Sequence, residues 1–447
     1  MIDIRLPDDS VLNQDDFLIG CATASYQIEG AAQEGGREPS IWDEFCRKPG
    51  AILDGGNGDV ACDHVHRMDA DLDLIRELGF QAYRFSLAWP RLIRPDGSLN
   101  PEGAAVYNRL VDGLLARGIQ PLATLYHWDL PQRLQETGGW QARDTAYRFA
   151  EYADQATRLL GDRIDWWATL NEPWCSAFLG HDLGIHAPGI KDRAAAFVVA
   201  HHLLLGHGLA MAVIRETVEG ARAGIVLNPE LAVPETGSDE DHHAARIVEM
   251  ERNELFLDPL FGRPVPEALL ASGAGDIPAR PEDAEIIAAP MDFIGFNYYT
   301  RSTVAAAPGK PGYKFIKKPG VPRTDIGWEV YPDGLRIVLD RLSEGWPLPP
   351  VYITENGAAY NDPGDPPDVD DTARQEYIAS HLAALDAAVR DGVDVRGWFC
   401  WSLMDNFEWA EGYSQRFGIV RVDYETQQRT PRGSARMLQR FLAAERV

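Results

Sequence analysis

Cysteine is scarce in this sequence. Among 447 residues there are five, and no two of them stand in a Cys-x-x-Cys spacing. An odd and sparse set excludes a disulfide framework and contains no zinc-binding pattern, so reduced thiols are expected. The N-terminus has no basic segment followed by an apolar run and does not resemble a secretory signal. Together these absences predict a cytoplasmic protein.

Positive charge and long apolar runs are also in short supply. Lys and Arg number 42 against 68 Asp and Glu, which gives a formal net charge of −26. A surface this acidic repels the phosphates of nucleic acids and anionic membranes, so neither is expected as a partner. We find no apolar stretch of about 18 residues, and we therefore predict no membrane span. A small neutral substrate fits this charge balance.

Eight short apolar runs, rich in β-branched and aromatic residues, recur along the chain. Runs of this kind are typical of strands that are buried on both faces, as in a parallel sheet. They are Phe17–Thr23, Ala82–Ser86, Pro121–Tyr126, Trp166–Leu170, Ala223–Leu227, Phe293–Phe296, Val351–Thr354 and Trp398–Trp401.

Amphipathic segments lie between these runs, for example Asp69–Leu78, Pro101–Arg117 and Thr372–Arg390, each followed by a glycine that favours a helix end. Eight strands alternating with helices predict α/β architecture, namely a single (β/α)8 TIM barrel that forms one catalytic domain over residues 1–447. An open doubly wound sheet is the alternative, but no Gly-rich phosphate turn follows the first strand. Residues 301–332 and 356–371 are predicted to be long loops on the C-terminal face.

Polar and aromatic residues follow or end many of the predicted strands. Because catalytic residues of such barrels come from the C-terminal ends of several strands, we expect these side chains to meet at one mouth. They are Arg84 on the second strand, His127 and Trp128 after the third, Asn171 and Glu172 after the fourth, Asn297 and Tyr299 after the sixth, Glu355 after the seventh, and Trp401, Glu408 and Trp409 on and after the eighth.

Two of these side chains, Glu172 and Glu355, are carboxylates on different strands. Breaking a glycosidic bond needs one protonated carboxyl group and one ionised carboxylate, and different surroundings must separate their pKa values. Arg84 and Tyr299 are candidates to keep Glu355 ionised, whereas an apolar setting near Trp174 and Trp167 favours a protonated Glu172. Pro173 predicts an extended backbone at Glu172. Two carboxylates suffice for this chemistry, so no cofactor and no metal is expected.

Tryptophans add to the same pattern, because the C–H faces of sugar rings stack on indole. Trp128, Trp174, Trp328, Trp401 and Trp409 all end or follow strands. This set of aromatics beside paired carboxylates predicts a carbohydrate site.

The motifs resemble glycoside hydrolase family one, the β-glucosidases and their relatives. The resemblance runs from Phe17 to Val420 and rests on motifs in the same order along the chain. They include Tyr83-Arg-Phe-Ser, His127-Trp-Asp-Leu-Pro, Thr169-Leu-Asn-Glu-Pro-Trp, Phe296-Asn-Tyr-Tyr, Ile353-Thr-Glu-Asn-Gly and Trp401-Ser-Leu-Met-Asp-Asn-Phe-Glu-Trp.

The resemblance implies a retaining β-glucosidase in which Glu355 is the nucleophile and Glu172 the acid/base, acting on small β-glucosides or cello-oligosaccharides. A retaining pair lies about 5–5.5 Å apart, a spacing that the sequence does not contain. The resemblance also assigns a role to each further site residue. Asn171 holds the 2-hydroxyl, Gln27, His127, Glu408 and Trp409 hold other glycone hydroxyls, Trp401 forms the stacking floor, Asn297 and Tyr299 line the same subsite, and Trp174 and Trp328 are walls of the aglycone site.

Three other functions compete with this one. A 6-phospho-β-glycosidase needs a cationic phosphate pocket, but Glu408 stands at the corresponding place and would repel a phosphate. A catalytically silent sugar-binding barrel would need a broken carboxylate pair, and a metal-dependent hydrolase would need more ligands than His64 and His66 offer. The oligomeric state is left as a monomer or small homo-oligomer.

These alternatives make different predictions for initial rates on nitrophenyl glycosides of both anomers, with and without a 6-phosphate, in EDTA. We expect fast cleavage of the unphosphorylated β-glucoside and no loss of rate in EDTA. Faster cleavage of the 6-phosphoglucoside would favour the phosphoglycosidase, and no cleavage of any glycoside would favour the sugar-binding barrel.

Overall fold

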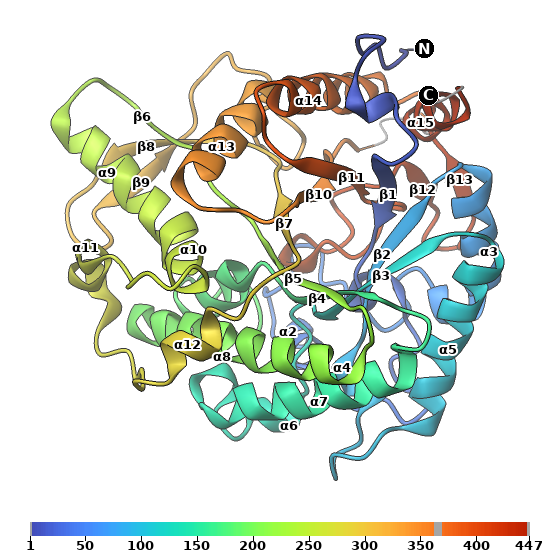
Figure 1. Cartoon of the computed structure of the whole chain (residues 1–447), viewed down its shortest axis with the longest axis horizontal. Coiled ribbons are helices and arrows are strands. Elements are labelled where there is room, and N and C mark those ends of the chain that lie inside the picture. The colour runs from blue at the N-terminus through green and yellow to red at the C-terminus, as the bar shows by residue number, and fades with distance from the viewer. Residues whose placement is uncertain (1, 362–368, 445–447) are drawn as a thin grey trace.

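The computed structural model describes residues 2–361 and 369–444, and its centre is a closed barrel of eight parallel strands (Figure 1). Around the barrel the order is β1-β11-β10-β7-β5-β4-β3-β2, so each strand pairs with its neighbours and the sheet has no free edge. The strands are β1 (Leu18–Ala22), β2 (Ala82–Ser86), β3 (Gln120–Tyr126), β4 (Trp166–Asn171), β5 (Arg222–Leu227), β7 (Phe293–Asn297), β10 (Val351–Asn356) and β11 (Val395–Trp401). The predicted barrel and its eight strands are confirmed, with ends that differ by a few residues.

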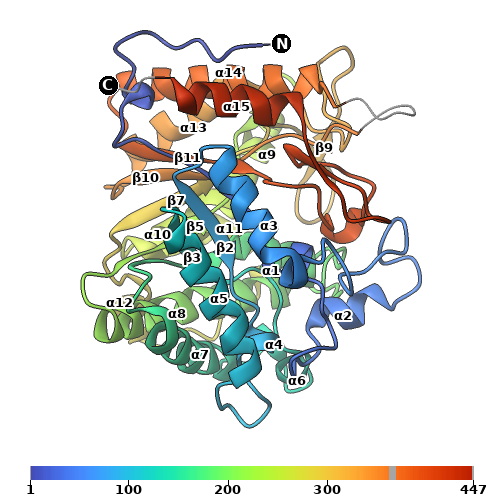
Figure 2. The same cartoon turned by 90° about the vertical axis from the view of Figure 1, so that its right-hand side faces the viewer.

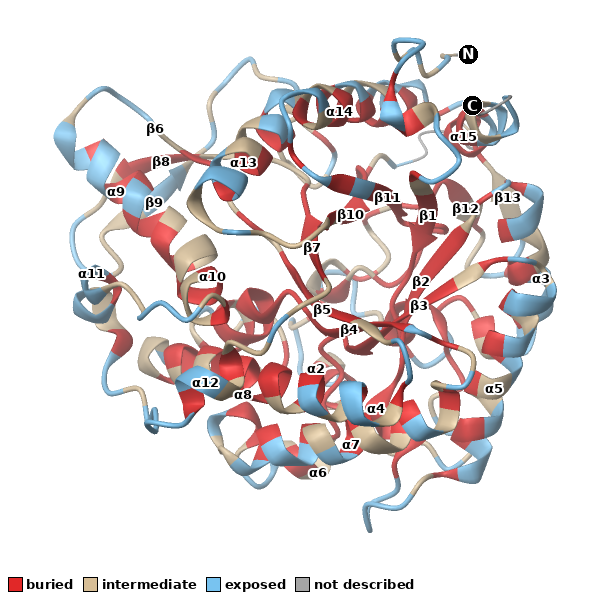
Figure 3. Cartoon of the chain, in the orientation of Figure 1, coloured by how far each residue is buried: buried red, intermediate tan, exposed pale blue. Residues whose placement is uncertain are grey.

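Burial explains the apolar character of these strands. Figure 3 shows them buried, with the surrounding helices exposed only on their outer faces. Inside the barrel, Trp166 meets Phe293 and Phe399 edge-on, with ring centroids 5.7 and 6.0 Å apart. Trp166 and Phe293 are the first residues of their strands, so large rings fill the N-terminal end of the barrel. The polar chemistry is therefore confined to the C-terminal end.

Helices surround the barrel and follow its strands. The longer ones are α3 (His64–Glu77), α5 (Pro101–Ala116), α7 (Asp144–Leu160), α8 (Arg193–Thr217), α9 (Asp239–Glu249), α13 (Pro332–Gly345), α14 (Thr372–Arg390) and α15 (Gly433–Ala443). The shorter ones are α1 (Ser25–Ile28), α2 (Ile41–Cys46), α4 (Trp89–Leu92), α6 (Gln132–Gln135), α10 (Leu255–Leu260), α11 (Glu267–Leu269) and α12 (Asp283–Ile287). Figure 2 shows α15 lying along α14 on one side of the barrel.

The three predicted helices are present. α14 has the predicted bounds and α5 ends one residue earlier than expected, at Ala116. α3 begins five residues before the predicted start, at His64. The His64 Nδ1 atom lies 2.8 Å from a carboxylate oxygen of Asp71, two helical turns later. This buried contact extends the helix beyond the apolar stripe from which it was predicted.

One helix, α8, is long and apolar enough to cross a membrane by length and composition. The segment contains no unbroken apolar run of this length, because three histidines interrupt its apolar residues. Of its most apolar 18 residues, 72% are buried inside the protein. α8 is therefore a core helix of the barrel.

The segment 301–332 was predicted to be a long loop, but part of it forms strands. It contains β8 (Ser302–Ala306) and β9 (Tyr313–Ile316), which join β6 (Ala232–Pro234) in a three-stranded sheet beside α9 (Figure 1). Its glycines and prolines are typical of loops, so the sequence pattern did not indicate this hairpin. Of the second predicted loop, 356–371, β10 includes Asn356, and residues 362–368 lie outside the described part.

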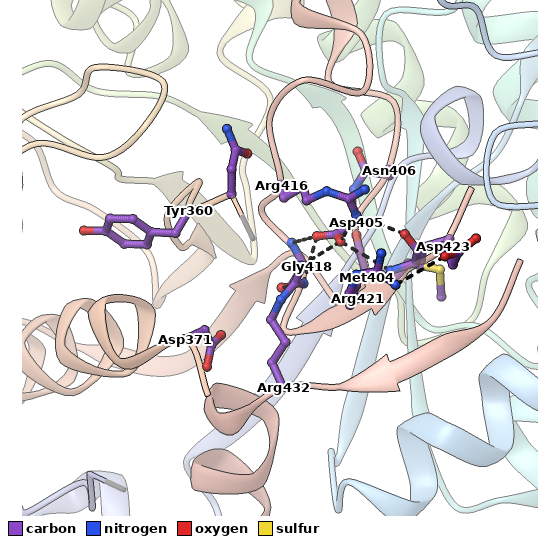
Figure 4. Close-up of polar contacts among 12 residues, drawn as sticks. Tyr360, Asp371, Met404, Asp405, Asn406, Arg416, Gly418, Arg421, Asp423 and Arg432 are labelled. Carbon is purple, nitrogen blue, oxygen red and sulfur yellow. Dashed lines mark hydrogen bonds and ion pairs between the residues drawn. The ribbon is translucent and has the colours of Figure 1, made fainter. Parts of the chain in front are cut away.

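A buried charge cluster holds the segment that follows β11 (Figure 4). Asp405 is fully buried and accepts two bonds from Arg432, at 3.0 and 2.9 Å, and one from Arg416 at 2.6 Å. The backbone N–H groups of Gly418 and Val422 also donate to it, at 3.0 and 3.3 Å. Burial alone would raise the pKa of Asp405, but the neighbouring guanidinium groups outweigh it and lower that pKa. The short hairpin of β12 (Val420–Val422) and β13 (Arg429–Pro431) is joined to the barrel in this way.

We expect Asp405→Ala to lower the free energy of unfolding by about 3–5 kcal/mol, because it leaves buried guanidinium groups without their carboxylate. Denaturant unfolding followed by tryptophan fluorescence measures the effect. The matched control is Glu44→Ala, which removes an exposed partner of Arg47 and should leave stability unchanged. Equal stability of the two variants would contradict the role assigned to this cluster.

Candidate active site

Glu172 and Glu355 both lie at the C-terminal end of the barrel and are buried. Glu172 directly follows β4, and Glu355 is the last residue but one of β10. Their residue exposures are 6% and 3%. The prediction of an extended backbone at Glu172 was wrong, because its φ is +44°, in the left-handed region. Tertiary contacts, among them its N–H to the Val226 carbonyl at 2.9 Å, override the local preference that Pro173 imposes.

The Glu355 carboxylate has a charged and a neutral donor, one on each oxygen. Arg84, within β2 and two residues before its end, places Nη1 2.6 Å from Oε1. The Tyr299 hydroxyl donates to Oε2 at 2.6 Å. Burial raises the pKa of Glu355, while the Arg84 charge and the Tyr299 hydrogen bond oppose that rise. Both predicted partners are thus in contact with Glu355 and favour its ionised form.

The Glu172 carboxyl has only neutral donors. Asn297 donates to Oε1 at 2.6 Å and the Cys175 thiol donates to Oε2 at 3.0 Å. Burial, followed by the negative charge of Glu355, raises the pKa of Glu172 to about 7. Of the two tryptophans expected near Glu172, Trp174 lines the same pocket, but Trp167 is fully buried and donates to the carbonyl of Ile164.

Asn171 links the two carboxylate sites. Its Oδ1 accepts from Arg84 at 2.6 Å and from Asn297 at 3.1 Å, and its Nδ2 lies 3.1 Å from His127 Nε2. Burial and the Arg84 charge lower the pKa of His127 well below its ordinary value, so the ring is neutral and its Nε2 accepts this bond. Nδ1 of His127 therefore carries the proton, and it has no hydrogen-bond partner among the residues that the structure describes.

Gln27 and Glu408 form a second polar pair. Gln27 Nε2 donates to Asn406 and to the Phe407 carbonyl, both at 2.9 Å, and reaches Glu408 Oε2 at 3.4 Å. Gln27 Oε1 is buried without a partner. Burial and the charges of the catalytic-site carboxylates raise the pKa of Glu408 to about 8. At neutral pH, Glu408 is accordingly a neutral group that can both donate and accept hydrogen bonds.

Aromatic rings form the rest of the site. Trp128 and Trp409 lie 4.7 Å apart, and His127 stacks on Trp401 at 5.9 Å. Trp128 and Trp409 have positive φ values of 79° and 49°. Trp328 packs against Tyr299 with centroids 5.2 Å apart.

A pocket of about 500 Å³ opens between these side chains. Eight of the predicted residues line it, namely Trp128, Glu172, Trp174, Asn297, Tyr299, Trp328, Glu408 and Trp409. The other six, Gln27, Arg84, His127, Asn171, Glu355 and Trp401, adjoin them through the contacts given above. The structure therefore brings every predicted site residue to one place.

Several residues of the site were missed. The guanidinium of Arg252 lies 3.1 Å from the ring centroid of Trp174, and Thr354 donates to Asn297 Oδ1 at 2.7 Å. Trp42 packs on Trp409 at 4.5 Å. Thr354 directly precedes Glu355 in the sequence, and this position could have identified it as a site residue. Arg252 and Trp42 come from segments remote in sequence, and no local pattern points to them.

The two histidines considered as metal ligands are apart from this pocket. His64 pairs with Asp71, and His66 lies between Asp63 and Glu34, at 2.6 and 3.0 Å. Over residues 2–361 and 369–444, no group of three or more His, Cys, Asp or Glu side chains is arranged to hold a metal ion.

A closed (β/α)8 barrel with two differently charged carboxylates in a tryptophan-lined pocket is the architecture of a glycoside hydrolase. The family model described as Glycosyl hydrolase family 1 matches residues 11–447, and the chain belongs to this family. Within the family it is a β-glucosidase.

Its relatives cover nearly the whole chain. It is 47% identical over 428 residues to a β-glucosidase of an Agrobacterium species, covering 94% of this chain and 93% of that one. It is 44% identical to a 1,4-beta-D-glucan glucohydrolase of Thermotoga neapolitana, covering 92% and 98%. The solved complex of virulence factor SghA, from Agrobacterium tumefaciens, with its substrate analog salicin superposes with a TM-score of 0.93 at 47% identity, covering 96% of each chain.

The two carboxyl environments predict a bell-shaped pH dependence of kcat/KM on an aryl β-glucoside. The rate should rise with pH as Glu355 ionises and fall near pH 7 as Glu172, whose pKa is raised to about 7, loses its proton. Glu172→Gln should remove the basic limb. Glu408 titrates in the same range, so Glu408→Gln is the control and should keep that limb. A basic limb that persists in Glu172→Gln would show that this limb does not belong to Glu172.

Proposed function

We propose that Glu355 is the nucleophile and Glu172 the acid/base of a retaining double displacement. The observation that supports this assignment is the asymmetry of their partners. Arg84 and Tyr299 stabilise a negative charge on Glu355, whereas Glu172 has no cation in hydrogen-bond contact and a raised pKa. Glu355 attacks the anomeric carbon while Glu172 protonates the leaving oxygen, and Glu172 then activates water to release the sugar.

The glycone is held by the polar groups deep in the pocket. Gln27 Oε1 and His127 Nδ1 are a buried acceptor and a buried donor without protein partners, and sugar hydroxyls supply the complementary groups. Asn171 binds the 2-hydroxyl, and Glu408 binds further hydroxyls together with Trp409. Trp401 is the stacking floor, Trp128 flanks it, and Asn297 and Tyr299 line the same subsite beside the nucleophile. These roles rest on the geometry and on the family pattern.

The aglycone lies toward the open side of the pocket, between Trp174 and Trp328. Both rings line the pocket, as do Leu179 and Ile185. Such a surface accepts flat apolar groups and further sugar rings. SghA is described with salicin as its substrate analog, and the Thermotoga neapolitana relative as a 1,4-beta-D-glucan glucohydrolase. We propose small β-glucosides and cello-oligosaccharides as substrates.

The alternative of a 6-phospho-β-glycosidase is disfavoured by the charges around Glu408. Arg416, the nearest cation along the chain, donates to Asp405 and to the Val422 carbonyl. A phosphate at this subsite would meet a carboxyl group in place of a cation. A silent sugar-binding barrel is disfavoured because both glutamates and their partners are in place.

We further propose that residues 1–447 act as one catalytic domain in the cytoplasm. The five cysteines, all of them described, are free thiols, which supports a reducing compartment.

We expect Glu355→Ala to abolish hydrolysis, with a loss on the order of 10⁴-fold or more, because no other group can form the glycosyl intermediate. Azide should restore cleavage of an activated aryl β-glucoside and produce the α-glucosyl azide, which NMR identifies. The control is Glu411→Ala, a carboxylate on the pocket rim, which should retain most of the activity. A β-configured azide product from Glu355→Ala would show that Glu355 is not the nucleophile.

A further inference from the structure

The thiol of Cys175 faces the Glu172 carboxyl group inside the pocket. Sγ lies 3.0 Å from Glu172 Oε2, and Asn228 Nδ2 approaches the same sulfur at 3.5 Å. Cys175 is 6% exposed, and what exposure it has is to the pocket that it lines. The other four thiols do not line this pocket.

Backbone geometry holds the sulfur in this position. The Glu172 N–H donates to the Val226 carbonyl and the Cys175 N–H donates to the Glu172 carbonyl, both at 2.9 Å. These bonds, with the left-handed backbone at Glu172, form a turn that leads into the π-helical segment Cys175–Leu179. The two side chains therefore face each other across one turn, and Asn228 orients the sulfur from β5's end.

When Glu172 is ionised, the thiol acts only as a donor to it. Burial and the neighbouring carboxylate raise the pKa of Cys175 well above its ordinary value, so it keeps its proton. A hydrogen bond to a carboxylate favours the ionised form, and this one opposes the effect of burial on Glu172.

When Glu172 is protonated, the hydrogen-bond partners of its two oxygens differ in their ability to accept the new proton. Thr354 donates to Oδ1 of Asn297, which fixes the amide so that its Nδ2 faces Oε1. An amide N–H cannot accept a proton from Oε1, whereas a sulfur is a weak acceptor as well as a weak donor. Oε2, beside Cys175, is therefore the oxygen that can carry the acid proton without facing a donor.

We propose that Cys175 is a positioning residue that holds Oε2 of Glu172 and sets the balance between its acid and base forms. The proposal rests on the proposed acid/base role of Glu172. The thiol is a donor when Glu172 is ionised for water activation, and it turns away or accepts when Glu172 carries the proton for leaving-group departure. No bond to sulfur is formed or broken.

The test compares the pH dependence of kcat/KM on an aryl β-glucoside for the wild type and three variants. Cys175→Ala removes the donor and should move the basic limb up by about 0.5–1 pH unit, the value of a weak hydrogen bond to a charged group. Cys175→Ser retains a donor and should keep the limb at or below its wild-type position. Cys400→Ala, a buried thiol on β11 outside the pocket, is the matched control and should leave the limb unchanged.

A basic limb that does not move in Cys175→Ala, or that moves upward equally in Cys175→Ser, would overturn the proposal. The Glu172→Gln profile separates this failure from a failure of the acid/base assignment, since a limb that Glu172→Gln removes belongs to Glu172 whatever Cys175 does.

A second measurement does not depend on activity or on the Ala variant. The infrared S–H stretching band of Cys175 is isolated as the difference between the spectra of the wild type and Cys175→Ser. At a pH above the pKa of Glu172 this band should lie at low frequency. It should shift to higher frequency in Glu172→Gln, where the acceptor is neutral. A band that is the same in both backgrounds would contradict the hydrogen bond on which the proposal depends.

Discussion

The ion pair between Arg84 and Glu355 is the interaction on which the chemistry of this site depends. It joins β2 to β10, two strands that are not neighbours in the barrel, and the same guanidinium also donates to Asn171 at the end of β4. Burial raises the pKa of Glu355, and the Arg84 charge opposes that rise and favours the ionised form that the proposed nucleophile needs. The barrel closure makes the pair possible, because it brings residues that are 271 positions apart to one mouth.

The charge that Arg84 maintains on Glu355 also acts on the other carboxyl groups. Glu172 is buried and Glu408 is partly buried near Glu355, and the charge of Glu355 adds to burial in raising their pKa values to about 7 and about 8. Burial and this one ionised group together therefore favour the protonated forms of the other two carboxyl groups. The different roles that we propose for these similar side chains, as nucleophile, acid and sugar ligand, follow from their different neighbours.

Backbone strain is also present at this site. Trp128, Glu172 and Trp409 have positive φ values, and each such residue costs on the order of 1–3 kcal/mol. The surroundings compensate for this cost. The Trp128 indole donates to the Asn171 carbonyl at 2.9 Å, and Asp405 with its arginines anchors the segment that leads from Trp401 to Trp409. The buried charge cluster thus lies outside the pocket but supports residues that line it.

The eight apolar runs determined the barrel, because strands buried on both faces must be apolar, and the residues at their ends determined which side chains meet at its mouth. Only the tertiary structure decided the left-handed backbone of Glu172, the hairpin within 301–332, the contact of Arg252 with the pocket, and the contact of Asn228 with Cys175. These features depend on bonds between segments distant in sequence, such as Val226 with Glu172 and Asn228 with Cys175. Local patterns record the propensity of a residue and the side of the chain that is buried. They do not record which donor faces which oxygen, and in a pocket of this kind those pairings set the protonation states that make the two glutamates different.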